Sequence, residues 1–166
     1  MNQNPQLDLH IHTPYSDGSW SIEKIVSNSR KPIGKVDLDM IAISDHNTLN
    51  GLHEFKHVLE KFNENQSHPL IGIGAIEISA SYLPDTMDQE IHVLGYFPLN
   101  SDFKSEPFSS LQQCIEAYKN SKNRQLEMIL ENIIQDGYSE LSVQEFYEFA
   151  YSISADGNLN RPSIAR

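Results

Sequence analysis

Apolar and polar positions alternate at the start of the chain, where Leu7, Leu9 and Ile11 are separated by polar side chains. This period of two predicts a strand that turns one face toward a core. Apolar positions then recur at helical spacing up to Pro32. Segments with strand patterns and segments with helical spacing continue to alternate after it, which gives the predicted order βαβαβ. The segments are a helix that begins near Ile22, a strand over 40–44, a helix over 52–62 and a buried strand over 70–78.

The pattern after residue 81 predicts one more strand followed by helices. Residues 82–89 have the composition of a loop, and residues 90–97 are predicted to form a fourth strand. Two separate helices are predicted over 110–119 and 124–135, and Gly137 is placed to end the second one. Strands that alternate with helices predict an α/β domain with a mostly parallel sheet or barrel.

A helix start is predicted after residue 141. Ser142 and Glu145 have the spacing of a capping box, and Leu141 and Phe146 are placed to form a hydrophobic staple around it. Cys114 is the single cysteine, so no internal disulfide is possible, and its place on an apolar helix face predicts a buried thiol.

Composition limits the class of protein. The chain has 166 residues, 39% of them hydrophobic and 21% charged, which predicts one soluble domain with a core. It has no apolar run of the roughly 18–20 residues that a membrane span needs and no signal peptide at its start, and we expect a cytoplasmic protein. The net charge of −11 argues against binding to long nucleic acid or to an anionic membrane. A phosphorylated partner would therefore need metal ions as its positive charge.

Candidate metal ligands lie on or directly after the predicted strands. His10 and His12 are two residues apart, so their side chains share one strand face about 6.6 Å apart, although such a pair can also be a solvent-facing polar stripe. Because strand carboxyl ends meet at one face of a parallel barrel, side chains from several strands can converge there. Imidazoles and carboxylates together suit zinc, iron, nickel or manganese. The further candidates are Asp17, Asp45, His46, Glu77 and His92.

Two of these candidates have alternative interpretations when taken alone. Glu77 can be a carboxylate in water at the end of a strand, although the apolar residues that precede it argue against this. His92 fits a hydrogen-bonded core histidine nearly as well as a metal ligand.

A second histidine pair lies on the helix that follows the second strand. His53 and His57, with Glu54 between them, resemble the zinc motif of metalloproteases. That helix should use its apolar face to cover a sheet, Lys56 interrupts the motif, and a third ligand is not evident. We therefore expect both histidines to be exposed and not to bind metal.

Four motifs follow one another along nearly the first hundred residues. They are Asp8-Leu9-His10-Ile11-His12 with Ser16-Asp17-Gly18, Ile43-Ser44-Asp45-His46-Asn47-Thr48, Gly74-Ala75-Ile76-Glu77-Ile78, and Ile91-His92-Val93-Leu94-Gly95-Tyr96. In this order they resemble the motifs of the polymerase and histidinol phosphatase (PHP) domain family. The resemblance is closest to the stand-alone metal-dependent phosphoesterases that act on nucleotides or short oligonucleotides. The segment up to Arg166 resembles the inserted helical region of that branch.

The resemblance implies the N-terminal part of a distorted (β/α)7 TIM-like barrel, with residues 1–100 as barrel core and 101–166 as a helical insertion. It also implies two or three divalent ions, such as manganese, zinc or iron, in a complete family member. His10 and His12 would hold one ion, and Glu77 would bridge ions. Asp45 would be a residue of the catalytic site that orients a metal ligand without binding the ion itself. The remaining implied ligands are Asp17, His46 and His92.

The chain departs from the family pattern near its end. Ser163 stands where relatives usually have histidine, and the later histidine and Asp-x-His motifs are absent. These departures predict a fragment or truncated product with reduced activity and an open barrel, whose unpaired strand edge favours self-association. Arg161 is a candidate phosphate contact, although a surface salt bridge is an equally good interpretation.

The function expected from this resemblance is hydrolysis of phosphate esters of nucleotides or short oligonucleotides, with a small phosphorylated substrate as the partner. Two alternatives remain open. One is an amidohydrolase-type barrel that cleaves C–N or C–O bonds, and the other is a non-catalytic, metal-binding PHP remnant that serves as an interaction module.

Overall fold

The computed structural model describes residues 4–30, 37–81 and 90–137, together with residues 142, 144–145, 148–149 and 152. Contacts between residues divide the chain into two compact units, Met1–Asp102 and Phe103–Arg166. The assignment of residues 101–166 to a helical insertion stays a prediction. Among the described residues, none of the helices combines the length and the apolar character needed to cross a membrane.

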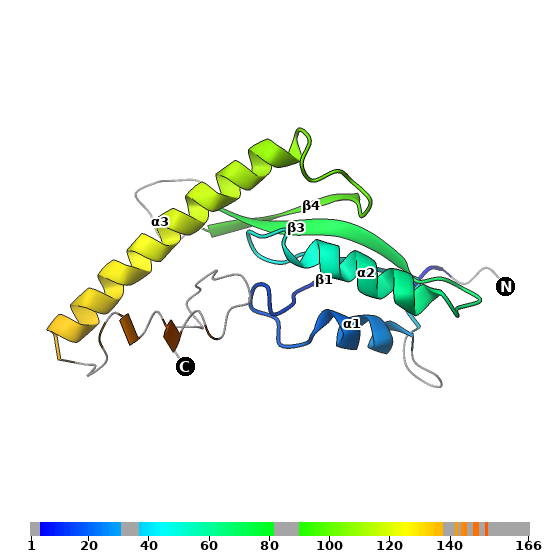
Figure 1. Cartoon of the computed structure of the whole chain (residues 1–166), viewed down its shortest axis with the longest axis horizontal. Coiled ribbons are helices and arrows are strands. Elements are labelled where there is room, and N and C mark those ends of the chain that lie inside the picture. The colour runs from blue at the N-terminus through cyan, green and yellow to red at the C-terminus, as the bar shows by residue number, and fades with distance from the viewer. Residues whose placement is uncertain are drawn as a thin grey trace. The chain divides into compact units, whose positions relative to one another are not determined.

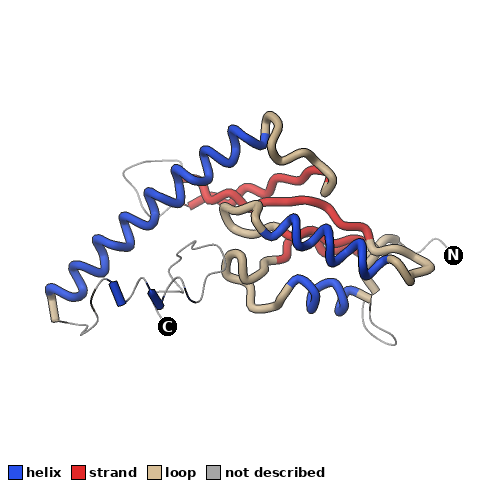
Figure 2. Tube along the Cα trace, in the orientation of Figure 1, coloured by secondary structure: helices blue, strands red, loops and turns tan. Residues whose placement is uncertain are grey.

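The first unit holds a four-stranded sheet and two helices (Figure 1, Figure 2). The order of elements confirms the predicted βαβαβ pattern and the additional strand. The sheet order follows the chain, β1-β2-β3-β4. The elements are β1 (Leu7–Ile11), α1 (Ile22–Ser29), β2 (Met40–Ile43), α2 (Gly51–Asn63), β3 (Ile71–Ser81) and β4 (Glu90–Pro98).

The direction of the strands agrees with the sequence for three of the four. Strands β1, β2 and β3 are parallel, whereas β4 runs antiparallel to β3, in a register from Ile73 opposite Pro98 to Ser81 opposite Glu90. The predicted mostly parallel sheet is therefore right for the first three strands only. The loop predicted over 82–89 lies outside the described residues. Of the expected barrel, the described residues form a four-stranded sheet that does not close.

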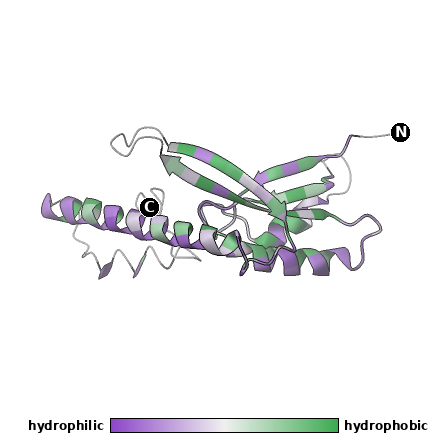
Figure 3. Ribbon diagram, turned by 90° about the horizontal axis from the view of Figure 1, so that it is seen from above, coloured by the Kyte–Doolittle hydropathy of each residue, from purple (hydrophilic) through white to green (hydrophobic). Residues whose placement is uncertain are grey.

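Both helices cover one face of this sheet (Figure 3). Ser21 caps α1 by accepting a hydrogen bond from the backbone N–H of Lys24, and the apolar face of α1 is buried. On α2, Phe55 and Leu59 are buried against the sheet, where a Cβ at Gly72 would meet both. Alternate residues of β3 therefore face the helices, and the residues between them, including Glu77, face the other side.

The second unit contains one continuous helix, α3 (Phe108–Gln135), where the sequence predicted two. The polar residues 120–123 interrupt the apolar pattern, but none is a glycine or proline, so the backbone continues through them. Cys114 is exposed, so the predicted buried thiol is wrong. Apolar spacing identifies one face of a helix but does not show whether another element covers that face.

The predicted signals at helix ends are confirmed where residues are described. Gly137 has a φ of +75°, and its N–H donates to the carbonyl of Ile134 over 3.0 Å. The N–H of Ser142 donates to Glu145 over 2.8 Å, and the N–H of Glu145 donates back to the Ser142 hydroxyl over 3.2 Å, which is a capping box. The staple residues Leu141 and Phe146 lie outside the described residues.

We expect Gly74→Ala to lower the free energy of unfolding by about 1–3 kcal/mol, the usual cost of an extra methyl group in a packed site. A Cβ at Gly74 would overlap the ring of Phe97, with Cδ2 only 2.6 Å away. Gly95→Ala is the matched control, because its Cβ would lie at an ordinary 3.5 Å from Cγ2 of Ile76. Urea unfolding of both variants measures the difference. Equal losses would show that the close approach of Phe97 does not restrict residue 74.

Candidate metal centre

A tight loop follows β1 and carries Asp17 back over His12. The carbonyl of Thr13 accepts hydrogen bonds from the N–H groups of Ser16 and Gly18, both over 3.0 Å. A Cβ at Gly18 would overlap the backbone of His12 and Thr13, so only glycine allows this return of the chain. As a result, Nδ1 of His12 and Oδ1 of Asp17 are 2.7 Å apart.

The pairing of β2 and β3 continues beyond the end of β2 and aligns His46 with Glu77. The N–H of Glu77 donates to the carbonyl of Asp45 over 3.2 Å, and the N–H of Asn47 donates to the carbonyl of Glu77 over 2.9 Å. These bonds form a parallel bridge between His46 and Glu77. Two predicted ligands from different strands are therefore held side by side by the backbone.

His92 comes to the same edge of the sheet by a different route. It lies near the beginning of β4, where it pairs with Ser79 of β3. The sequence placed His92 inside the fourth strand, as observed, but did not give the direction of that strand. Because β4 is antiparallel, its beginning meets the carboxyl end of β3.

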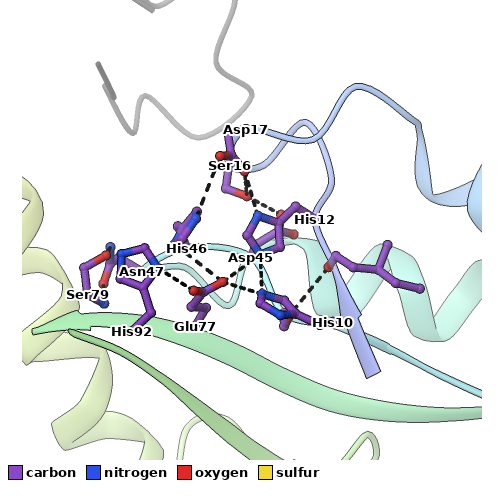
Figure 4. A network of polar contacts seen from close by, with 12 residues as sticks. His10, His12, Ser16, Asp17, Asp45, His46, Asn47, Glu77, Ser79 and His92 are labelled. Carbon is purple, nitrogen blue, oxygen red and sulfur yellow. Dashed lines mark hydrogen bonds and ion pairs between the residues drawn. The ribbon is translucent and has the colours of Figure 1, made fainter. Parts of the chain in front are cut away.

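Glu77 lies at the centre of the four imidazoles (Figure 4). Its side chain is 3% exposed, so it is not the carboxylate in water that the sequence left as an alternative. Its Oε2 is 2.6 Å from Nε2 of His10, 2.8 Å from Nε2 of His12 and 3.8 Å from Nδ1 of His46. Its Oε1 is 2.6 Å from Nδ1 of His92.

The six predicted ligands form three overlapping groups. In each group, one donor atom from every residue lies within 4.8 Å of the others. Three residues, His12, His46 and Glu77, each belong to two groups, so the groups are not independent. The groups are His10, His12 and Glu77; His12, Asp17 and His46; and His46, Glu77 and His92.

The surroundings shift the pKa of two of these side chains toward the form that binds metal. Burial acts to raise the pKa of Glu77, but the hydrogen bonds with His10 and His12 and the neighbouring imidazoles outweigh it and lower the pKa. Burial lowers the pKa of His46, against the attraction of Glu77. An ionised carboxylate and a neutral imidazole are the forms that bind divalent ions.

The side chains around Glu77 lie at hydrogen-bonding distance from it. Three of the four nitrogen–oxygen distances are 2.6–2.8 Å, and the fourth is 3.8 Å. Two donors at about 2.0–2.2 Å from one tetrahedral ion are roughly 3.3–3.6 Å apart, so these donors would have to separate by about 1 Å or less to share an ion. The His10 and His92 side chains are 50% and 43% exposed, so solvent reaches the cluster beside them.

Asp45 lies behind this cluster. Its residue is 2% exposed, and its carboxylate accepts three hydrogen bonds of 2.6–2.7 Å, from the N–H and hydroxyl of Thr13 and the hydroxyl of Ser16. Burial raises the pKa of Asp45, against these hydrogen bonds, which lower it. These hydrogen bonds make Asp45 the anchor of the loop that carries Asp17.

The remaining candidates have different positions. His53 and His57 are exposed on α2, as the helix pattern predicted, and their expected lack of metal binding stays a prediction. Glu54 accepts a hydrogen bond of 2.9 Å from the hydroxyl of Tyr15, so it supports the loop after β1. Arg161 and Ser163 lie outside the described residues.

The sequence analysis missed the role of several polar residues around the ligands. Thr13 and Ser16 bind Asp45, and Asn47 binds Ser79. Asn47 has a φ of +50°, a conformation that asparagine adopts more readily than most residues. In the sequence, the only indication of a role for Asn47 is its position directly after Asp45-His46. That position does not identify Ser79 as its hydrogen-bonding partner.

Comparison with known proteins places the chain in a family. The sequence model of the PHP domain matches residues 8–134. None of the curated proteins matches the sequence.

Two solved structures have a similar fold. One is a provisionally assigned metal-dependent phosphoesterase from Bifidobacterium adolescentis, with a TM-score of 0.70 and 22% identity over 98% of this chain and 49% of its own. The other is an amidohydrolase from Chromobacterium violaceum with bound sulfate and no metal, with a TM-score of 0.66 and 17% identity over 97% of this chain and 48% of its own. This chain thus spans about half the length of each. The family and these neighbours imply a TIM-like barrel, of which the described sheet is a part.

We expect Asp45→Ala to lower the free energy of unfolding by about 2–4 kcal/mol, because it leaves the buried N–H of Thr13 without its acceptor. Asp45→Asn should cost much less, since the amide oxygen can keep the bonds to Oδ1 and the amide nitrogen can donate to the Thr13 hydroxyl. Urea unfolding of both variants compares them. If both lost the same stability, the charge of Asp45 and not its hydrogen bonding would hold the loop.

Proposed function

This chain belongs to the PHP domain family, and we propose that it is a metal-dependent phosphoesterase acting on nucleotides or short oligonucleotides. The observation that carries the proposal is the position of Glu77, a carboxylate 3% exposed with one imidazole nitrogen at 2.6 Å from each of its oxygens. A carboxylate so buried needs cationic partners, and the donors around it are those that divalent ions prefer. The family and this cluster together indicate divalent metal binding by a hydrolase.

In the proposed site, two or three ions of manganese, zinc or iron are held by the three overlapping groups. His10, His12 and Glu77 hold the first ion, and Asp17, His46 and His92 complete the neighbouring positions. When bound, such ions supply a hydroxide near neutral pH and neutralise the phosphoryl oxygens. Asp45 keeps the loop with Asp17 in place while the half-exposed His10 and His92 border the side from which substrate enters.

A phosphorylated substrate fits the charge of the chain only if metal is present. The net charge of −11 would repel a phosphate monoester, and bound divalent ions would reverse that repulsion locally. We also propose that the site lies in a distorted (β/α)7 barrel, into which residues 101–166 are inserted as helices.

The proposal is tested by hydrolysis assays on the purified chain with added Mn²⁺. Phosphate release is measured for nucleoside monophosphates, and chromatography follows the nucleotides released from short oligonucleotides and the products from a comparison series of amides. We expect hydrolysis of the phosphate esters that stops when a chelator removes the ions. Cleavage of amides alone would favour the amidohydrolase-type alternative, and metal binding without cleavage of either class would favour the non-catalytic one.

We expect His12→Ala to lower the bound metal more than His10→Ala, because His12 belongs to two ligand groups and His10 to one. Metal content after equilibrium dialysis against Mn²⁺ measures this, and His53→Ala on the exposed surface of α2 is the matched control. An unchanged metal content in His12→Ala would show that this histidine is only a polar strand position.

A further inference from the structure

Asn47 occupies an unusual position between two of the ligand-bearing strands. Its residue is 7% exposed, and its φ of +50° lies in the left-handed region. It directly follows His46, at the point where the chain turns away from the sheet toward α2. A buried polar side chain in this conformation needs hydrogen-bonding partners, and all of those described for it lie on β3.

The side chain of Asn47 replaces a peptide group of the sheet. Its Oδ1 accepts from the N–H of Ser79 over 3.0 Å, and its Nδ2 donates to the hydroxyl of Ser79 over 3.1 Å. Its own N–H donates to the carbonyl of Glu77 over 2.9 Å. The β2–β3 pairing thus continues for one more step after the backbone of β2 has left the sheet, with a side-chain amide as the last member.

This extra step connects the elements that supply one ligand group. His46 precedes Asn47, Glu77 accepts its backbone hydrogen bond, and Ser79 pairs with His92 on β4. We propose that Asn47 is a positioning residue that holds His46, Glu77 and His92 in register as a metal-binding group. Its importance for catalysis rests on the proposed function, whereas the geometric coupling can be tested by itself.

The test compares Asn47→Gly with a matched control at the other end of β3. Glycine tolerates the positive φ, so this variant removes the amide without adding backbone strain. Asn63 also makes a two-point contact with one residue: its side chain accepts from the N–H of Leu70 and donates to the carbonyl of Leu70, both over 2.9 Å, at a point before β3 begins. Asn63→Ala therefore removes a comparable pair of hydrogen bonds away from the ligands.

The first measurement is Mn²⁺ binding by titration calorimetry. We expect Asn47→Gly to weaken at least one Mn²⁺ site by about 10–100-fold, the usual effect of losing a group that orients metal ligands, while Asn63→Ala leaves every site within about twofold. In a His92→Ala background, Asn47→Gly should weaken the remaining sites by much less than in the natural chain, because both changes affect the same group. Equal Mn²⁺ affinities in the Asn47 and Asn63 variants, or an undiminished effect with His92→Ala, would overturn the proposal.

The second measurement needs no metal. Imidazole nitrogen resonances of the metal-free protein report the surroundings of each histidine. We expect Asn47→Gly to shift the resonances of His46 and His92 and to leave those of His53, exposed on α2, unchanged, whereas Asn63→Ala shifts neither His46 nor His92. If the natural chain bound no Mn²⁺, the proposed function would fail, and this measurement would still decide the positioning role. Unshifted resonances of His46 and His92 would overturn that role.

Discussion

The burial of one carboxylate is the constraint around which the first unit is organised. Glu77 is 3% exposed, and a buried charge is costly unless it is paired and hydrogen-bonded. Its partners are four imidazoles from β1, β4 and the segment after β2, so the carboxylate determines where these elements must come together.

The two faces of the sheet have separate tasks. One face is covered by α1 and α2, whose buried apolar residues include Ile22, Val26 and Phe55. The other face carries Glu77, with His92 on the neighbouring strand and His10 on β1. Alternation along β3 allows one strand to serve both faces, since successive side chains point in opposite directions. The site is therefore built on strands and on a tightly hydrogen-bonded loop.

Two hydrogen-bonded anchors next to the candidate ligands explain how separate segments keep their positions. Asp45 holds the loop with Asp17 through Thr13 and Ser16, and Asn47 extends the strand pairing to Ser79. Since His12, His46 and Glu77 are each shared between ligand groups, a shift of one anchor is transmitted to more than one group. Ions bound in this arrangement would influence each other through common ligands.

The sequence by itself determined the order of elements, the apolar faces and the identity of the residues that converge. A period of two or of 3.6 depends only on which side of an element is buried, and histidines and acidic residues at the ends of successive strands mark a common edge. It could not reveal the antiparallel direction of β4, the continuity of α3 or the exposure of Cys114. Periodicity contains no information on strand direction or on what covers a face. The roles of Asp45 and Asn47 were likewise decided by the tertiary structure, because their partners Thr13 and Ser79 are 32 residues away in the chain. A hydrogen bond over that distance depends on how the strands are placed, which local sequence patterns do not encode.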